Sequence, residues 1–524
     1  MATLLMVAAS AGVAGAQSVD LESLPLVTDL PDGVKADSYS KNDHYFGVSM
    51  WGEFFQSQEL GMVGMVALDG GKAYFYEPFS GLPTGSYLVG DVDGDKITVS
   101  FPQKMQVETY PDYNLDPEGN VLVTNNFYAF KCRLSDDGET SRLEMDNADP
   151  TVTFTIAADG SISLDGDAYI ALIFSEKDEN GADTFEWTGY ADSEIVYNVV
   201  TETPTAMPAG ASPEVWVMDC GGEVRLVKGV MQGDDLYLQG VLESMPQGVV
   251  KGSRDSATGR YLFQTQYVGI DERNSHYAYF VPATYTMEEN EFEELEPAYT
   301  PASAVEISYD ESARTLTTGE GEALVFGTQP AGGFVLYGYT EPTFRWQDMS
   351  TPMVPANPVI TDYTYYDYLE FGGLFFTLPR VAADGRVLNP ADYYYNIYLD
   401  DEPLVLYPDE YYEIEEPMEN IPCEFENFSE ITYYGEDYEF VIYARGFSRI
   451  GVQGVYVNPD GTQTKSDLVY HEVSSLQSVE DAGVVSTEWF DISGRRISAS
   501  ATGLAICRQT MDDGTVRTLK VLKK

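Results

Sequence analysis

The chain has 524 residues, of which 44% are hydrophobic, so it is long enough for several packed domains and does not have the composition of a disordered protein. Its 85 Asp and Glu against 29 Lys and Arg give a formal net charge of −56. Such a charge repels phosphate backbones and anionic lipid surfaces, so nucleic acid and anionic membranes are not expected as partners. The 38 Tyr and 25 Phe favour strands.

The first sixteen residues are apolar or small and end in Ala14-Gly15-Ala16. This pattern predicts a signal peptide over residues 1–16, cleaved before Gln17, although the basic segment that usually opens such a peptide is missing. Residues 17–58 are then predicted to form a polar N-terminal leader. No later stretch reaches the roughly 20 apolar residues of a membrane span, so no transmembrane segment is predicted. We therefore expect an exported protein.

From residue 59 onwards, short β-branched and aromatic runs alternate with Gly, Asp and Pro turns, which is typical of an all-β fold. One stretch occurs twice: KAYFYEPFSGLPTG at 72–85 and DLYLQGVLESMPQG at 235–248 share Tyr, Pro and Gly at an offset of 163. Further matches follow in the same order, at offsets between 149 and 164: Tyr87–Gly90 with Val249–Gly252, Ile97–Pro102 with Tyr261–Gln264, 127–130 with 276–280, 151–164 with 304–317, and 185–190 with 334–339. The order predicts a duplication, with related antiparallel β domains at 59–203 and 213–347 separated by a Pro/Ala/Gly linker.

After a second Pro-rich boundary, residues 357–473 contain about seven long aromatic strands, the number and length expected of an immunoglobulin-like or fibronectin-like β-sandwich. A polar linker over 474–483 leads to the C-terminal segment, residues 484–524. That segment differs in charge from the rest, because residues 489–524 carry seven Lys or Arg against three Asp.

WFDISGRRI, then GLAICR, then a DGTVRTLKVLKK ending give this segment the order of strand, Gly-Arg turn, Gly-led strand and short basic strand. It resembles the C-terminal sorting domain of type IX secretion cargo, with the motif positions at Asp491, Gly494, Arg495, Gly503 and Lys520. The resemblance implies that the secretion machinery is a partner. It also implies that the protein passes through the periplasm and crosses the outer membrane of a Gram-negative cell, to be released or attached to the cell surface. From the residues alone, Gly494 and Gly503 mark turns between three short strands of a small terminal β-sandwich. A capping hairpin with no export role is the alternative.

No sequence motif selects a catalytic centre, a cofactor or a metal. The three histidines, His44, His276 and His471, fall in separate regions, whereas nucleophilic catalysis needs a base within reach of its nucleophile. Ser448 in GFSRIG has the wrong spacing for a nucleophile elbow and is interpreted as structural. Asp91–Asp95 resembles part of a calcium loop but has its glycine too early, so an ordinary turn is favoured. The four cysteines, Cys132, Cys220, Cys423 and Cys507, allow three pairings that the spacing does not distinguish, and buried thiols are the favoured interpretation.

Exposed tyrosines could stack on sugar rings, and Tyr363, Tyr365 and Tyr368, together with residues 392–402, are the candidates. Alternation along a strand places part of each run in the core. The function best matched is therefore a multidomain surface protein without catalysis, acting in adhesion or in glycan or protein binding. A secreted polysaccharide-acting hydrolase with an Asp/Glu pair is one alternative, and a structural component of a surface assembly is another.

Overall fold

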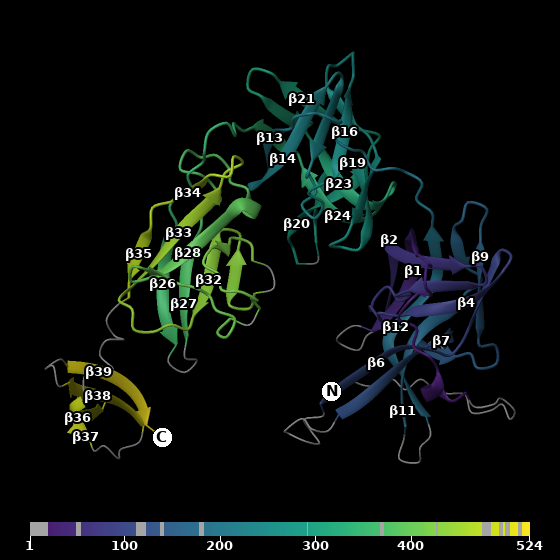
Figure 1. The fold of residues 1–524 in the computed structure, drawn as a ribbon, viewed down its shortest axis with the longest axis horizontal. Helices are drawn as coiled ribbons and strands as arrows, with labels where there is room; N and C mark the ends of the chain where they lie inside the picture. Colours follow the sequence, from purple (N-terminus) through teal and green to yellow (C-terminus); the bar gives the residue numbers. More distant parts are fainter. Residues whose placement is uncertain are drawn as a thin grey trace. The chain divides into compact units, whose positions relative to one another are not determined.

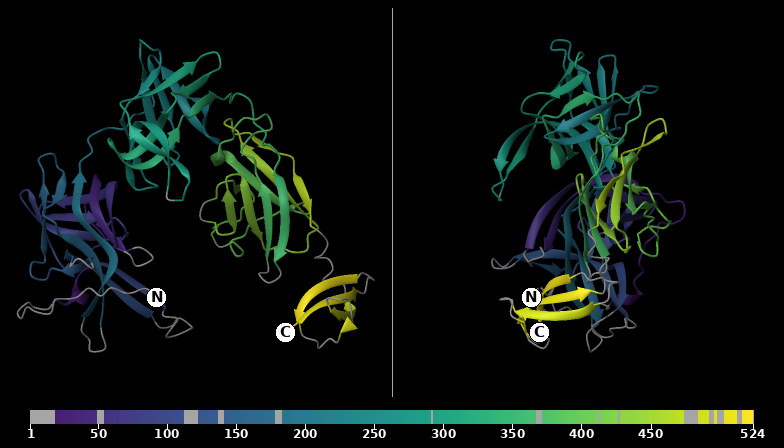
Figure 2. Two further views of the ribbon diagram at one scale, coloured as in Figure 1. Left: turned by 180° about the vertical axis from the view of Figure 1, so that it is seen from behind. Right: turned by 90° about the vertical axis from the view of Figure 1, so that its left-hand side faces the viewer.

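The computed structural model describes residues 19–48, 54–111, 122–136, 141–177, 183–290, 292–366, 371–411, 413–425, 428–473, 484–491, 496–497, 503–511 and 516–523. The chain divides into two compact units, Met1–Trp346 and Gln347–Lys524. The fold is all-β, as predicted: apart from two single 3-10 turns, η1 (Leu21–Ser23) and η2 (Pro390–Asp392), the regular elements of the described residues are strands (Figure 1). Figure 2 shows the same strands from two further sides.

The first copy of the duplicated domain spans residues 37–198 and contains twelve strands. These are β1 (Asp37–Val48), β2 (Phe54–Asp69), β3 (Lys72–Tyr76), β4 (Tyr87–Asp93), β5 (Lys96–Ser100), β6 (Gln103–Pro111), β7 (Leu122–Asp136), β8 (Ser141–Met145), β9 (Thr151–Ile156), β10 (Ile162–Leu164), β11 (Tyr169–Lys177) and β12 (Asp183–Asn198).

Eight of these strands close into an antiparallel barrel. Each pairs with the next in the order β1, β2, β3, β4, β5, β9, β10, β12, and β12 returns to β1. The remaining strands extend one side of the barrel, because β12 also pairs with β11, β11 with β7, and β7 with β6 and β8. The predicted leader is therefore too long: residues 37–48 and 54–58 are barrel strands, and Lys41 and Asp43 on β1 are buried.

The second copy spans residues 214–346. Its strands are β13 (Glu214–Cys220), β14 (Glu223–Gln232), β15 (Asp235–Gln239), β16 (Val249–Arg254), β17 (Tyr261–Phe263), β18 (Gln266–Asp271), β19 (His276–Glu289), β20 (Leu295–Pro301), β21 (Val305–Asp310), β22 (Thr315–Thr318), β23 (Glu322–Gln329), β24 (Gly332–Thr340) and β25 (Thr343–Trp346).

The second copy repeats the strand pairing of the first. Its closed barrel runs β13, β14, β15, β16, β17, β21, β22, β25, and β24, β23, β19 and β18 form the side extension with β20 on β19. The single long strand β12 is replaced by β24 and β25. Both copies have a glutamate with positive φ at this point: Glu194 (φ 50) within β12, and Glu341 (φ 47) between β24 and β25. Because every pairing has its counterpart, the two domains share one topology, which is the structural signature of the predicted duplication.

The pairing also tests the sequence matches. The repeated stretch is in register: Tyr74 faces Val89 on the next strand, as Tyr237 faces Lys251. Two other matches are out of register. Residues 127–130 correspond to 278–281 rather than 276–280, since Ala129 and Phe280 face the matched glutamines Gln103 and Gln266.

Tyr190 corresponds to Tyr337 rather than Tyr339. The reason is that Asp192 lies two residues before Glu194, as Tyr339 lies before Glu341, and each faces the same position of the neighbouring strand. In both misaligned matches, tyrosines or aromatic residues recur two positions apart, so a slipped alignment still pairs similar residues.

Both barrels are filled by their own side chains, as expected for eight strands. In the first copy Phe75, Ile97, Val99 and Phe154 are at most 1% exposed and belong to one apolar cluster that also contains Phe79, from the loop after β3. In the second copy the equivalent loop contributes Leu242, with the other members Leu236, Leu238, Phe263, Ile307 and Phe344. The loop after the third barrel strand therefore plugs one end of each barrel. We call it the plug loop; it comprises residues 77–86 in the first copy and 240–248 in the second.

The second unit begins with a two-sheet sandwich. One sheet has the order β26 (Val359–Tyr366), β27 (Phe371–Thr377), β32 (Asp437–Ile442), β31 (Ile431–Tyr434). The other has the order β29 (Glu402–Pro403), β28 (Tyr393–Leu399), β33 (Arg449–Val457), β34 (Gln463–Lys465), with β30 (Ile421–Pro422) on β28 and β35 (Val469–Glu472) on β33. In chain order this is the A-B-E-D and C′-C-F-G arrangement of immunoglobulin-like domains, as predicted.

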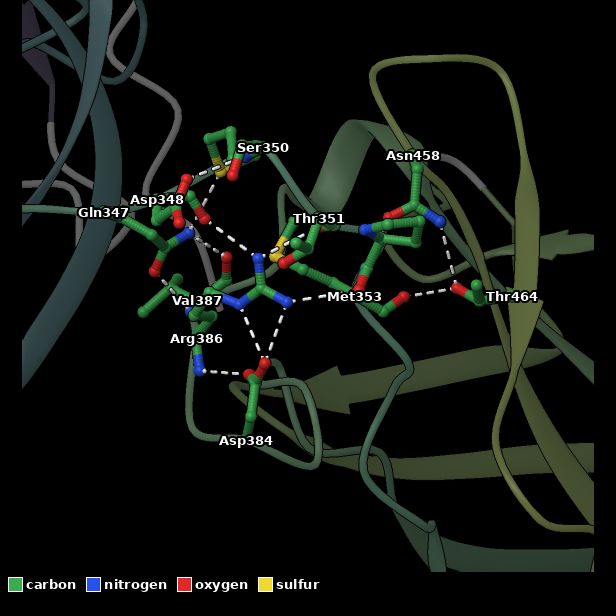
Figure 3. A network of polar contacts seen from close by, with 12 residues as sticks. Gln347, Asp348, Ser350, Thr351, Met353, Asp384, Arg386, Val387, Asn458 and Thr464 are labelled. Atoms are coloured by element: carbon green, nitrogen blue, oxygen red, sulfur yellow. Dashed lines mark hydrogen bonds and ion pairs between the residues drawn. The ribbon is translucent and has the colours of Figure 1, made fainter.

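An arginine fixes the segment that leads into this sandwich (Figure 3). The guanidinium of Arg386 donates to the carbonyl oxygens of Asp348 and Thr351 at 2.9 Å each and of Pro352 at 3.1 Å, and it pairs with Asp384 at 2.8 Å. Because one half-buried cation binds three of its carbonyl oxygens, the Pro-rich boundary is held against its own unit.

The C-terminal segment forms one four-stranded antiparallel sheet in its described part, with the order β37 (Arg496–Ile497), β36 (Val484–Asp491), β38 (Gly503–Met511), β39 (Val516–Lys523). The prediction of three strands in a small sandwich is corrected to this single sheet.

Candidate functional site

A cluster of charged side chains lies buried at the plugged end of the first barrel. Lys41 on β1 is 1% exposed, and its Nζ donates to the carbonyl oxygen of Pro78 at 2.6 Å and to Ser80 Oγ at 2.9 Å. The same Nζ lies 2.7 Å from Asp43 and 3.1 Å from Asp192, whose side chains are 0% and 1% exposed. Ser80 also donates its backbone N–H to Asp192 at 2.8 Å. Lys41 thus ties the plug loop to strands β1 and β12.

The cluster holds two carboxylates and one ammonium group, so one charge is not balanced. Burial raises the pKa of Asp192 to about 7, although Lys41 opposes this rise. Burial lowers the pKa of Lys41, but Asp192 and Asp43 outweigh it and keep the pKa above the usual value. One oxygen of each carboxylate is buried without a hydrogen-bond partner. The cluster therefore retains a proton to higher pH than an ordinary aspartate does.

The second copy places a different cation at the same point. Arg225 on β14 donates to the carbonyl oxygen of Val241 at 3.3 Å and to the hydroxyl of Tyr339 at 2.7 Å. It also pairs with Glu223 and, at 3.3 Å, with Glu243. Its guanidinium carbon lies 4.9 Å from the centre of the Tyr339 ring. The two glutamates are 46% and 64% exposed, so the charges here face solvent.

These two clusters occupy matched positions of the duplicated fold. Val241 and Glu243 match Pro78 and Ser80 at the offset of 163, and Tyr339 matches Asp192 in strand register. The cation, however, has changed strand. Lys41 faces Met62 on β2, whereas the matched pair is Met218 on β13 facing Arg225 on β14. What is common to both copies is a cation on the plug loop, which indicates a structural role for this cluster.

A shallow groove of about 460 Å³ lies on the outer surface of the second barrel. Strand β16, strand β17, the start of β18 and the linker between the two copies form it. Its lining residues are mostly polar: Thr205, Lys251, Ser253, Arg254, Asp255, Leu262, Gln264, Thr265 and Gln266. A volume of this size falls in the range of small-ligand sites.

The floor of the groove is rigid because one glutamine ties its strands together. Gln266 accepts from the backbone N–H of Lys251 at 2.8 Å and donates to the carbonyl oxygens of Lys251 and Gln264 at 2.9 and 3.0 Å. In the first copy Gln103 makes the same three bonds, to Val89 and Ser100. In the sequence the two glutamines are 163 residues apart, the same offset as the repeated stretch, but they lie outside the stretches that the sequence comparison matched.

The cations of the groove belong to the second copy alone. Strand pairing matches Lys251 to Val89 and Arg254 to Val92. Thr205 lies in the linker before the second copy, and the segment before the first copy runs beside the equivalent strands, since Tyr87 donates its backbone N–H to the carbonyl oxygen of Val27 at 2.8 Å and Leu26 bridges to Lys104. The scaffold is therefore shared between the copies, and the polar surface built on it is not.

The tyrosine runs divide between core and surface, as alternation predicted. Tyr393 and Tyr395 are fully buried between the sandwich sheets. Tyr363 and Tyr365 are half-buried, and Arg445 lies 5.0 Å above the Tyr365 ring. Tyr368 lies outside the described residues. No row of exposed tyrosine rings results from the described parts of these two runs.

The other sequence candidates hold structural positions. His44 pairs with Glu194 at 3.1 Å and His276 with Glu59 at 3.8 Å, while His471 lies on β35. Ser448 donates to Asp400 at 2.7 Å, which agrees with its structural interpretation. The predicted acidic turn at 91–95 is a two-residue hairpin between β4 and β5, with Gly94 at φ 63.

Three of the predicted sorting-motif residues are described, two at strand ends and one inside a strand. Asp491 ends β36 and faces Ala505, Gly503 begins β38 and faces Lys523, and Lys520 on β39 faces Ile506. Gly494 and Arg495 lie outside the described residues. Within this sheet Arg496 pairs with Glu488 at 3.0 Å.

Cys132, Cys220 and Cys423 are free thiols. Burial raises the pKa of Cys132 and of Cys423 to about 12, so both behave as small core residues, as favoured from the sequence. The side chain of Cys507 is not described.

No protein-family model matches the chain, and no curated protein matches it either. Among the described residues there is no helix long and apolar enough to cross a membrane, and no group of three or more His, Cys, Asp or Glu side chains is placed to hold a metal ion.

Proposed function

We propose that this chain is an exported surface protein that acts in adhesion by binding a glycan or a protein on the outside of its β domains, without catalysis. The observation that carries the proposal is the contrast between the two copies. Both keep the same packed barrel and the same plugged end, whereas Lys251 and Arg254, which line a polar groove on the outer surface of the second copy, stand where the first copy has Val89 and Val92. A filled barrel leaves its outer face as the surface for a ligand.

The alternative of a hydrolase needs two carboxylates open to a sugar chain. Asp43 and Asp192 do meet on one partner, Lys41, but both are buried under the plug loop. This pair therefore does not favour the hydrolase, and binding without cleavage remains the proposal.

Export rests on the resemblance of residues 484–524 to a sorting domain and on the predicted signal peptide. Removing residues 484–524 in a host with that secretion system should leave the protein in the periplasm. Unchanged exposure at the cell surface, measured by protease accessibility of whole cells, would reject the sorting role.

Binding is tested by passing the full-length protein over a panel of immobilised polysaccharides while new reducing ends are measured in the same tubes. The proposal predicts retention on at least one polysaccharide with no rise in reducing ends above the buffer control. Release of new reducing ends would support the hydrolase instead. If no polysaccharide of the panel retains the protein, the proposal of glycan binding is rejected.

A further inference from the structure

We propose that the groove on the second barrel binds a sugar that carries a single carboxylate, such as an acidic residue at the end of a glycan chain, with Arg254 as the group that holds the carboxylate. This inference rests on the proposed glycan-binding function and names the class of ligand. It starts from the charges of the groove and how they are balanced.

Arg254 is the cation of the groove that forms no ion pair among the described residues. Its Nε donates to the carbonyl oxygen of Gly259 at 3.2 Å, which holds the side chain in place. Its two terminal nitrogens have no partner among the described residues, and the side chain is exposed. The edge formed by the two terminal nitrogens of this planar guanidinium is therefore free, and its two parallel N–H groups match the two oxygens of a carboxylate.

The other charged groups of the groove are already used. Lys251 pairs with Asp235 at 2.8 Å. The carboxylate of Asp255 accepts from the backbone N–H groups of Ala257 and Thr258 at 3.1 and 3.2 Å and from the Thr258 hydroxyl at 2.9 Å. Asp255 keeps its negative charge, but its oxygens accept from its own turn and it forms no ion pair with Arg254, so the terminal N–H groups of Arg254 remain available to an incoming carboxylate.

The rest of the lining suits hydroxyl groups. The side chains of Gln264 and Thr265 are exposed and make no hydrogen bond among the described residues. An amide and a hydroxyl both donate and accept, as sugar hydroxyls do. Gln266 holds this edge in place through its three backbone bonds, so the groove is largely formed before a ligand arrives.

The charge of the whole chain limits the ligand further. A net charge of −56 repels a polyanion along its length, whereas a single carboxylate beside Arg254 is dominated by charges within a Debye length of about 8 Å. We therefore expect one acidic sugar in an otherwise neutral chain, not a polyuronate. A sialic acid and a glucuronic acid share this chemistry.

The test titrates the full-length protein by calorimetry with four probes: N-acetylneuraminyl-lactose, a glucuronyl disaccharide, lactose and polygalacturonate. At least one of the two acidic sugars should bind at least tenfold more tightly than lactose and more tightly per site than polygalacturonate. Whichever acidic sugar binds identifies the source of the carboxylate. Equal affinity for lactose, stronger binding of polygalacturonate, or no binding of either acidic sugar would overturn the assignment.

Variants locate the site. Arg254→Gln should weaken binding at least tenfold, and Gln264→Leu several-fold. Arg260→Gln is the matched control, since Arg260 lies just before β17, pairs with Glu306 at 2.6 Å and does not line the groove. It should change affinity less than twofold.

Binding that survives both groove variants, each with an unchanged melting temperature, would place the site elsewhere. In that case retention on polysaccharide would still support the proposed function. A wild-type protein that is retained on no polysaccharide would instead remove the proposed function itself.

Discussion

Lys41 and Arg225 donate hydrogen bonds to equivalent carbonyl oxygens in the two copies of the barrel, but the two cations lie on strands that are not equivalent. Lys41 donates to Pro78 O from β1, and Arg225 donates to Val241 O from β14, the counterpart of β2. The methionine that faces each cation, Met62 or Met218, sits where the other copy has its cation. The requirement that both copies satisfy is a positive charge on the plug loop, and either strand can supply it.

Replacing Lys41 tests this requirement. Lys41→Met leaves two buried carboxylates without a cation and should lower the free energy of unfolding by about 3–5 kcal/mol. Urea unfolding followed by fluorescence measures the loss. Lys96→Met is the control, because Lys96 pairs with Asp165 at the surface and should cost less than about 1 kcal/mol.

The double variant Lys41→Met/Met62→Arg repeats the arrangement of the second copy. The two side chains face each other across β1 and β2, so the new guanidinium can reach the same loop. It should recover at least about 1 kcal/mol of the loss. A double variant no more stable than Lys41→Met would show that the cation has a role specific to β1.

The buried carboxylates predict a pH dependence. Burial raises the pKa of Asp192 to about 7, whereas an unfolded aspartate titrates near about 3.9. Between these values the folded protein holds the proton more tightly than the unfolded chain, so this group stabilises the fold at acid pH and loses that contribution as pH rises through 7. Relative to Asp192→Asn, the wild type should lose stability from pH 5 to pH 8.

The matched control is Asp165→Asn. Thr155 and Lys96 lower the pKa of Asp165, so the stability that this carboxylate contributes is lost only at acid pH, as the pH falls through its lowered pKa. The difference in free energy of unfolding between the wild type and Asp165→Asn should therefore stay constant from pH 5 to pH 8. If plots of the free energy of unfolding against pH run parallel for the wild type and Asp192→Asn over this range, the cluster does not hold the additional proton.

Gln103 and Gln266 should matter equally. Each satisfies three backbone groups of its own barrel, so Gln103→Leu and Gln266→Leu should each lower stability by about 2 kcal/mol. Gln58→Leu, at an exposed position of β2, should stay within about 0.5 kcal/mol. A large loss in one copy and none in the other would argue against a shared structural role.

Arg386 should protect the entry to the sandwich. Arg386→Gln removes the donors to Asp348, Thr351 and Pro352, so subtilisin should cut within residues 347–358 several times faster. Arg449→Gln, which breaks an exposed pair with Asp401, is the control and should leave the cleavage rate unchanged. Equal rates for both variants would show that the three carbonyl bonds do not hold this segment.

The fold class and the duplication could be predicted from the sequence because strands show alternating apolar and polar residues and turns are marked by Gly, Pro and Asp. The stretch at 72–85 matched 235–248 correctly because Pro and Gly fix its turn. The matches at 127–130 and 185–190 slipped because aromatic residues recur two positions apart in both copies. A slip of two residues keeps every side chain on the same face of its strand, so the pattern cannot detect it.

The barrel-end cluster could not be predicted, for a different reason. Lys41 and Asp43 have the composition of an exposed strand, and the sequence does not show that Asp192, about 150 residues later, lies beside them. Nor does any match by sequence pair Lys41 with Arg225, since these residues are not aligned. The groove was missed because Arg254 replaces a valine of the first copy, so a search for repeated residues passes over it.

The central claim, binding without cleavage, is tested most directly by recovering the ligand. The full-length protein is held with the acidic sugar that it binds in calorimetry, at several times its dissociation constant, and the sugar is then separated and analysed by chromatography. We predict that the sugar is recovered intact in full, together with a binding signal that Arg254→Gln loses. Recovery of its separate acidic and neutral sugars in amounts that exceed the protein would show turnover and contradict the account.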